Sequence, residues 1–455
     1  MKSRDAWMDI KIGIERETHR LSLEGEISRL PQASQLQPPL FTKDFAESQL
    51  EIVTRPHTSI SALNNELDEF TAQARKAVSP EILWPFSMPP LLPPDSEIDI
   101  AHLGPDKKGQ EGELYRRGLA LRYGKPRQMI CGVHVNISIG NNLETFIENT
   151  SPMLPHELAD SRSSDARYLR LARNLHADLP YLVLITGASP LLGGMNPDAR
   201  RAAISYRNSK HGYARAEFRP YLDLVSLERY IAGIRRGLAT ESAKFRALGL
   251  MTNGVQQQLN SRVFQQEKEF YAPVRLKRTA REGESGLDAL EREGVEYLEL
   301  RFLDVDPFSP RGISEETLIV LHLFVLDALM TPSSGGTTDE LKSHLEATEE
   351  VALIDPSSFF EPGLDGNKNT LPLARTRKRL EALMPLARQL DADRDPRYVP
   401  TLEKQIARTI DPSRLPSSRF LRAFEDSGSS WTEFGMNTAR ILTKGEQHAM
   451  DYAGV

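Results

Sequence analysis

Residues 8–17 read MDIKIGIERE, and apolar side chains alternate with polar ones along this stretch. Ile10, Ile12 and Ile14 take one set of positions, and Glu15 and Glu17 take the other. Successive side chains of a β-strand point to opposite faces of its sheet. The stretch therefore predicts a strand with an aliphatic face toward the core and a polar face that carries two carboxylates.

Three further segments are expected to be strands with one polar face: residues 48–54, 130–139 and 295–303. His134 and Glu299 fall on polar faces of the last two. Strands with one apolar and one polar face indicate an α+β fold with a mostly antiparallel sheet, whose concave face carries the functional residues. Helices are expected at residues 60–77, 166–177, 227–239, 315–330 and 373–390, and a capping box at Ser285 starts a short helix that ends at Gly294.

The bulk composition is that of an ordinary globular protein. The chain has 455 residues, 26% of them charged, with a net charge of −6. A nucleic acid or a membrane surface as partner would favour a basic excess, so neither is expected. The single cysteine, Cys131, excludes an intrachain disulfide, and no apolar signal segment opens the sequence, so a cytoplasmic location is expected. The longest apolar runs, 179–185 and 318–330, are too short to span a bilayer.

Carboxylates recur on the polar faces. An isolated Glu-x-Glu pair is more often a solvated sheet edge than a site. Here an acidic segment at residues 44–51 and the two later strands add further ligand types. The candidate metal ligands are Glu15, Glu17, Asp44, Glu51, His134 and Glu299, with Glu47 in the same acidic segment. Converging carboxylates repel one another unless a cation lies between them, and oxygen ligands with one imidazole suit Mg²⁺.

Basic side chains gather near the last of these strands. Arg301 is two residues from Glu299 and so shares its face. Four others are expected in one loop after Pro273: Arg275, Lys277, Arg278 and Arg281. Arg207 stands apart in the run 205–209. Arginine binds carboxylate or phosphate at two points and lysine supplies a point charge, although a solvated basic turn is an equally good interpretation of the loop cluster alone.

Several well-known motifs are missing from the sequence. It contains no Walker A sequence, dinucleotide-binding glycine pattern, Gly-x-Ser-x-Gly elbow or His-Glu-x-x-His helix. Cys131 falls on the aliphatic side of its strand, which favours a buried structural thiol over a nucleophile.

The sequence also matches, in order, the motifs of a known family. The matching runs are GIERET (13–18), TKDFAE (42–47) with Leu50-Glu51, WPFSMP (84–89), YRRGL (115–119), GVH (132–134) with Asn136, GASP (187–190), YAP (271–273) with Lys277-Arg278, GES (283–285), EYLELR (296–301) and PFSP (307–310). By this ordered set the chain resembles the proteobacterial-type glutamate–cysteine ligases, distant relatives of glutamine synthetase. Each run is weak alone, and the set together is specific.

The resemblance implies a glutamine synthetase-like core, in which a bowl-shaped, mostly antiparallel sheet flanked by helices holds the active site. It implies a catalytic core over residues 1–315 and a helical C-terminal region over residues 316–455 packed on it. The six candidate metal ligands named above would bind Mg²⁺, which Mn²⁺ could replace. The expected catalytic cations are Arg301, Lys277 and Arg278. Arg207 would grip glutamate, and the acceptor pocket would comprise Phe45, Tyr115, Leu119, Gln128, Tyr213 and Tyr271.

The implied enzyme is an ATP-dependent carbon–nitrogen ligase. It would join the γ-carboxylate of glutamate to an amino acid amine through a γ-glutamyl phosphate, with ATP as co-substrate. With cysteine as acceptor, the reaction is the first step of glutathione biosynthesis. Its partners are therefore expected to be small molecules: glutamate, ATP, and cysteine or another amino acid.

Departures from the family pattern keep two other hypotheses open. Residues 214–219 replace an amide-rich segment near the acceptor, Cys131 replaces a small hydroxyl residue, and little resemblance remains beyond about residue 315. The first motif starts at Gly13, so the family's leader helix is expected to be missing or reduced. The second hypothesis is a γ-glutamyl ligase for a different amino acid or amine in a specialised pathway. The third is an inactive regulatory homologue, against which the complete set of metal ligands argues.

Overall fold

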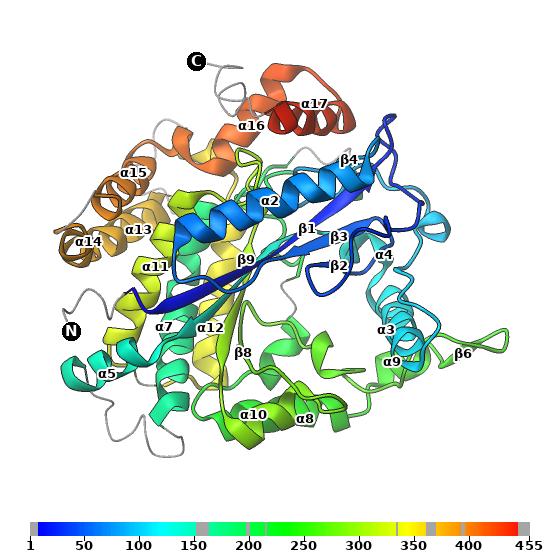
Figure 1. The fold of residues 1–455 in the computed structure, drawn as a ribbon, viewed down its shortest axis with the longest axis horizontal. Coiled ribbons are helices and arrows are strands. Elements are labelled where there is room, and N and C mark those ends of the chain that lie inside the picture. The colour runs from blue at the N-terminus through cyan, green and yellow to red at the C-terminus, as the bar shows by residue number, and fades with distance from the viewer. Residues whose placement is uncertain are drawn as a thin grey trace.

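The structure is a computed structural model, and it describes residues 8–151, 163–196, 201–213, 216–333, 335–360, 370–392 and 396–444. An antiparallel sheet lies at its centre and helices surround the sheet (Figure 1). The expectation about a leader helix falls mainly on residues 1–7, which are outside the described part of the chain. Among the described residues, no helix is both long enough and apolar enough to cross a bilayer.

Seven strands of the described chain form the main sheet, in the spatial order β2–β3–β1–β5–β9–β8, with β4 paired to the end of β1. Every neighbouring pair is antiparallel. The strand bounds are β1 Ile10–Leu21, β2 Phe41–Lys43, β3 Gln49–Val53, β4 Ile82–Leu83, β5 Val133–Ile139, β8 Val274–Lys277 and β9 Tyr297–Leu303. The four strands expected from alternation are therefore present as β1, β3, β5 and β9. The α+β class with a mostly antiparallel sheet is confirmed.

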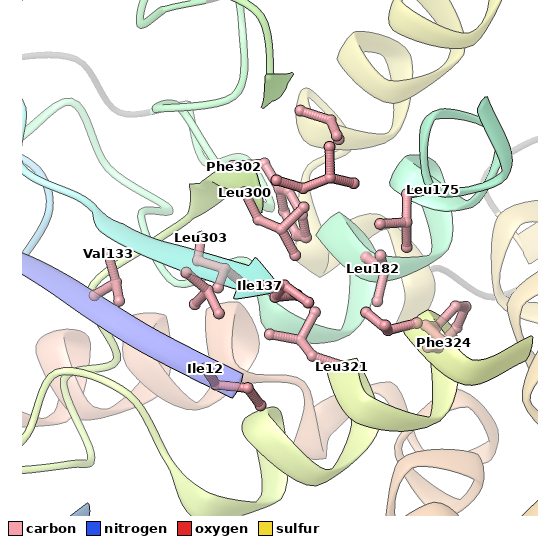
Figure 2. Close-up of a cluster of buried hydrophobic side chains, with 14 of the residues drawn as sticks. Ile12, Val133, Ile137, Leu175, Leu182, Leu300, Phe302, Leu303, Leu321 and Phe324 are labelled. Carbon is pink, nitrogen blue, oxygen red and sulfur yellow. The ribbon is translucent and has the colours of Figure 1, made fainter. Parts of the chain in front are cut away.

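One face of the sheet is aliphatic and forms the main core. Ile12 on β1, Ile137 on β5 and Leu300 on β9 are at most 5% exposed. Their side chains lie in one cluster with Leu182 of helix α7 (Ser163–Thr186) and Leu321 of helix α11 (Glu315–Met330) (Figure 2). Helix α2 (Ile60–Val78) joins the same cluster beside β1 and β3. Each fully buried aliphatic side chain stabilises the fold by about 1.5–3 kcal/mol, so this cluster is a main source of stability.

Serine N-caps set the start of several helices. Ser59, Ser226, Ser285 and Ser314 precede α2, α8 (Leu227–Ala239), α10 (Gly286–Glu293) and α11. In each case the serine hydroxyl accepts a hydrogen bond from the backbone N–H three residues later, which satisfies one otherwise unpaired donor of the first turn. Helix α10 ends before Gly294, as expected.

Two helices differ from expectation. Helix α7 extends to Thr186, because the apolar run 179–185 continues the helix instead of ending it. The segment 373–390, expected to be one helix, is two: α13 (Thr370–Ala382) and α14 (Met384–Asp391). The break occurs just before Pro385, whose ring restricts the preceding residue and whose nitrogen cannot donate a helical hydrogen bond.

The described residues after α11 are mostly helical. Their remaining α-helices are α12 (Thr338–Ala352), α15 (Tyr398–Ile410), α16 (Pro416–Ser427) and α17 (Trp431–Lys444), and α13 to α17 follow one side of the molecule in Figure 1. Arg379 of α13 donates two hydrogen bonds to Asp178 of α7 and one to Asp327 of α11, at 2.7–2.8 Å. Trp431 of α17 donates to the carbonyl of Pro89 at 2.8 Å. These contacts attach the C-terminal helices to the sheet-bearing part of the chain.

Helices border the polar side of the sheet. They include helix α3 (Lys107–Tyr123), helix α4 (Lys125–Gln128) and the 3₁₀ helix η3 (Ala216–Tyr221). The other α-helices and strands among the described residues are α5 (Asn141–Thr150), α9 (Ala243–Ala247), β6 (Met251–Thr252) and β7 (Val255–Gln256), the last two forming a separate hairpin.

Candidate active site

The polar face of the sheet is the floor of a cavity of about 360 Å³. Its walls come from the segment after β2, from α3, α4 and η3, and from the loops that carry Tyr213 and Tyr271. The site residues expected from the sequence that line it are Glu15, Glu17, Asp44, Phe45, Glu51, Tyr115, Leu119, Gln128, His134, Arg207, Tyr213, Tyr271, Lys277, Glu299 and Arg301. The sheet therefore brings together residues that are up to 286 positions apart in the chain, from Glu15 to Arg301.

Strand register brings the proposed metal ligands together. Glu15 on β1 lies directly opposite His134 on β5, and Glu17 on β1 lies opposite Glu51 on β3. Glu299 on β9 is placed on the same face, one strand beyond β5. Side chains at directly opposite positions have Cβ atoms about 4.5–5.5 Å apart, so the backbone ladder itself fixes their separation.

His134 occupies the centre of this cluster. Its Nδ1 lies 3.2 Å from a Glu15 oxygen and 3.9 Å from a Glu299 oxygen, and its Nε2 lies 3.6 Å from a Glu17 oxygen. Two groups, Glu15–His134–Glu299 and Glu17–Glu51–His134, each offer ligand atoms within 4.8 Å of one another. Groups of carboxylates with one imidazole can hold a divalent cation.

The charges of this cluster fit a cation. Burial, together with nearby Asp44 and Glu51, raises the pKa of Glu17 well above its usual value. Burial, together with Glu15 and Asp44, raises the pKa of Glu51 to about 8. Burial also lowers the pKa of His134, which favours the neutral imidazole that binds metals. Buried carboxylates that oppose each other's ionisation are those that a divalent cation would stabilise.

Three cations surround Glu299. Its Oε2 lies 3.7 Å from Lys277 Nζ and 3.8 Å from both Arg275 Nη1 and Arg301 Nη1. Within the described part of the chain no hydrogen bond reaches this buried oxygen. Burial alone would raise the pKa of Glu299, but the three cations outweigh burial and hold this pKa far below its usual range. One carboxylate facing three cations leaves positive charge available for an anion beside the metal-binding groups.

Arg207 presents unused donors to the cavity. It is 1% exposed, and its guanidinium packs against Gly132, where any Cβ would collide with it. Its Nε and Nη1 have no hydrogen-bond partner among the described residues. A buried polar group without a partner costs free energy, so these donors favour a bound carboxylate or phosphate. Gly132 is therefore needed for the close approach of Arg207 to β5.

Two stacked tyrosines connect Arg207 with Arg301. The rings of Tyr213 and Tyr271 have centroids 5.3 Å apart and planes 19° apart. Arg207 lies 5.5 Å from the Tyr213 centroid, and Arg301 lies 5.5 Å from the Tyr271 centroid. The Tyr213 hydroxyl donates to the carbonyl of Ile130 at 3.0 Å. Stacking and cation–π attraction thus hold the two arginines at a fixed spacing.

Four basic residues were expected in one loop after Pro273. This expectation was wrong for Arg275 and Lys277. Both belong to strand β8, where their alternate positions place them on the cavity floor. The strand was missed because it is only four residues long. Arg278 follows the strand and is not brought to the cavity lining. It donates instead to the carbonyl of Gly294 and, at 3.0 Å, to Glu293.

The surroundings of Glu47 and Cys131 indicate structural roles for both residues. The Glu47 carboxylate accepts hydrogen bonds from the backbone N–H groups of Gln32 and His102, at 3.0 and 2.8 Å, so it fastens the acidic segment to neighbouring loops. Cys131 is fully buried, as expected, and burial raises the pKa of its thiol well above the usual value. A buried neutral thiol is a poor nucleophile.

Other lining residues were not singled out as site residues from the sequence. They are Lys43, Gly112, Arg116, Tyr123, Phe218, Gln266, Lys268 and Glu269. Most lie on loops or helices, where no strand alternation marks the inward side. One signal was available: Tyr115, Leu119 and Tyr123 are spaced four residues apart and share one face of α3.

Comparisons with known proteins place the chain in a family. Residues 1–351 match the family model of glutamate–cysteine ligase. The chain is 32% identical over 456 residues to a glutamate–cysteine ligase of Clostridium acetobutylicum, covering 94% of each chain. It is 34% identical to that of Janthinobacterium, covering 95% of this chain and 85% of the relative. The crystal structure of glutamate–cysteine ligase from Francisella tularensis in complex with AMP matches with a TM-score of 0.82 at 26% identity, covering 98% of this chain and 92% of the other.

Proposed function

Because the chain belongs to the glutamate–cysteine ligase family of ATP-dependent ligases, we propose that its cavity joins the γ-carboxylate of glutamate to the amine of cysteine. One observation carries the proposal: three cations around Glu299 adjoin two carboxylate groups that share His134. Phosphoryl transfer depends on positioning and on compensation of phosphate charge, and both are available on this floor.

Magnesium ions would bind to the carboxylates and the imidazole of the floor. The proposed ligands are Glu15, Glu17, Asp44, Glu51, His134 and Glu299. When bound, Mg²⁺ would offset the negative charge of the ATP phosphates. The assignment is supported by the two groups of ligand atoms that share His134. Burial, reinforced by nearby carboxylates, also raises the pKa of Glu17 and Glu51.

In the first step, a γ-carboxylate oxygen of glutamate attacks the γ-phosphorus of ATP, and ADP leaves with the electron pair of the broken P–O bond. The product is γ-glutamyl phosphate. Arg301 and Lys277, which face the floor, would offset the charge of the transferring group, and we assign Arg275 to the same role in place of Arg278. Fixed cations at the site of developing charge lower the barrier without reorganisation.

In the second step, the amine nitrogen attacks the acyl carbon, and inorganic phosphate leaves with the electron pair of the C–O bond. The nitrogen loses a proton as the amide forms. Arg301 would stabilise the oxyanion of the tetrahedral intermediate. Arg207, with its two unpaired donors, would hold the glutamate α-carboxylate. The proposed acceptor pocket comprises Phe45, Tyr115, Leu119, Gln128, Tyr213 and Tyr271.

Residues 1–315 are proposed as the catalytic core, and residues 316–455 as a helical region that supports it. The proposal is supported by the absence of any residue beyond 315 from the described lining of the cavity. It is also supported by the polar contacts that Arg379 and Trp431 make with the core.

A non-cysteine acceptor is the second candidate. It is favoured by one observation: Phe218 lines the cavity and lies in the segment that departs from the family pattern.

One assay separates these functions. ADP release would be measured with Mg²⁺, ATP and glutamate across a panel of acceptor amino acids, with hydroxylamine as a small acceptor that traps γ-glutamyl phosphate. Selective turnover with cysteine is expected. Hydroxamate formation with hydroxylamine, together with faster ADP release with another amino acid than with cysteine, would establish the second candidate. Absence of any glutamate-dependent ADP release would reject the ligase.

A further inference from the structure

Phe218 separates the active-site cavity from a second cavity behind its wall. The second cavity has a volume of about 40 Å³. Phe218 and Tyr271 line both spaces, so they form the partition between them. Leu222, Pro273 and Leu345 line only the second space, which makes its wall largely apolar.

The phenyl ring of Phe218 is held firmly in the partition. It is 2% exposed and packs edge-on against Tyr123 and Phe264, with ring centroids 6.3 and 5.1 Å away. The next residue, Arg219, forms ion pairs with Glu346 at 3.2 Å and Glu349 at 2.7 Å on α12. These contacts attach η3 to α12, the helix that also carries one wall of the second cavity through Leu345.

Phe218 also belongs to the apolar side of the active-site cavity. Its neighbour Tyr123 shares a helix face with Tyr115 and Leu119, which line the same cavity. This apolar wall faces a floor made of carboxylates and cations. In a ligase that binds ATP and glutamate at the charged floor, the apolar wall is the surface suited to the side chain of the acceptor.

We propose that Phe218 sets the upper size of the acceptor side chain by closing the second cavity. Small acceptors such as cysteine fit in front of the ring, whereas leucine or phenylalanine would need the space behind it. Loss of the ring joins the two spaces and supplies an apolar lining for a longer side chain. This inference rests on the proposed γ-glutamyl ligase function.

The test compares kcat/KM for leucine, phenylalanine and cysteine in Phe218→Ala, in the milder Phe218→Leu, and in the wild type. We expect the leucine-to-cysteine ratio to rise about tenfold or more in Phe218→Ala, since a pocket discriminates roughly 10–200-fold per methylene group. The KM values for glutamate and ATP should not change. Phe70→Leu, which removes a buried ring of α2 that lines neither cavity, is the matched control.

A second substitution tests the path of the acceptor side chain. Leu345 is partly buried and lines only the second cavity, so Leu345→Phe in the Phe218→Ala background should refill that space and remove the gain for leucine. If Phe218→Ala fails to fold, Phe218→Leu decides the question with a smaller expected gain. An unchanged leucine-to-cysteine ratio in a folded variant that still forms γ-glutamyl hydroxamate would overturn the inference alone. A wild type without hydroxamate formation would instead overturn the ligase function.

Discussion

Arg122 of α3 donates hydrogen bonds to both carboxylate oxygens of Glu269, at 2.9 and 3.1 Å, and the two side chains are 0% and 1% exposed. Glu269 also accepts from the hydroxyl of Tyr123 at 2.7 Å and from the backbone N–H of Gln265. This buried pair joins the helix that carries the apolar wall of the cavity to the loop that leads to Tyr271. The position of the wall relative to the sheet therefore depends on it.

Replacement of Glu269 with Gln should destabilise the protein by about 3–5 kcal/mol, because Arg122 keeps its charge and loses its buried counterion. The KM for the acceptor should rise as α3 loosens, whereas the KM for ATP should change less. Chemical unfolding and steady-state kinetics would measure both effects. Glu291→Gln, which breaks an exposed pair with Arg235, is the matched control and should cost far less stability than Glu269→Gln.

Loss of the tyrosine stack should impair catalysis more than stability. Tyr271→Leu removes the ring between Tyr213 and Arg301 and should lower kcat/KM by about 5–30-fold, consistent with roughly 1–2 kcal/mol of stacking and cation–π attraction. Tyr271→Phe keeps the ring and should stay within about threefold of the wild type. Equal losses in both variants would show that the hydroxyl, and not the stack, matters.

Magnesium should stabilise the enzyme against heat. At a concentration 100 times its Kd, a ligand bound only by the folded state adds about 2.7 kcal/mol. The melting temperature should therefore rise with Mg²⁺ and fall with a chelator, and Glu15→Gln should reduce the shift. Glu66→Gln, which changes a buried carboxylate outside the cavity, should leave the Mg²⁺-dependent shift intact. A wild type with no shift would contradict the metal assignment.

Removal of one charge from the floor should abolish turnover. Glu299→Gln leaves Arg275, Lys277 and Arg301 without their shared carboxylate and deletes a proposed metal ligand. Glutamate-dependent ADP release should fall by about three orders of magnitude or more while the circular dichroism spectrum stays native. Activity within tenfold of the wild type would show that the phosphoryl site lies elsewhere.

His176 on α7 should make the protein less stable in acid. It is fully buried, and burial, reinforced by nearby His344, lowers its pKa to about 3. Above pH 6.5 the imidazole is neutral in both states and contributes nothing to pH dependence. Below 6.5 the unfolded chain takes up a proton that the folded chain resists, so stability falls by about 1.4 kcal/mol per pH unit toward pH 3. Unfolding midpoints at pH 7 and pH 5 should differ less in His176→Leu than in the wild type.

The strands that carry charge could be predicted well from the sequence. Alternation in 8–17 and 295–303 is strong because one face is aliphatic and the other holds carboxylates. Such strands also reveal the face on which their ligands lie, which is why Glu15 and Glu299 were assigned to a common surface before any register was known. The exact neighbours could not be predicted, because strand order and register depend on contacts distant in sequence.

The walls of the cavity were harder to predict. Strand β8 has only four residues, too few for its alternation to stand out, so Arg275 and Lys277 were expected in a loop. Phe218 and Glu269 come from short irregular segments whose inward side is set by packing, not by a period. The change within residues 214–219 was recognised, but residues 214 and 215 lie outside the described part of the chain.

The floor and the wall of the cavity come from different kinds of structure, and this has an evolutionary consequence. A one-residue slip in any of the floor strands would turn its charged side chains to the opposite face, so an insertion or deletion there would dismantle the site. The wall rests on a helix and a 3₁₀ turn whose side chains can be exchanged one at a time. Descendants of such a protein can therefore acquire new acceptors by point mutation while inheriting the same phosphate chemistry.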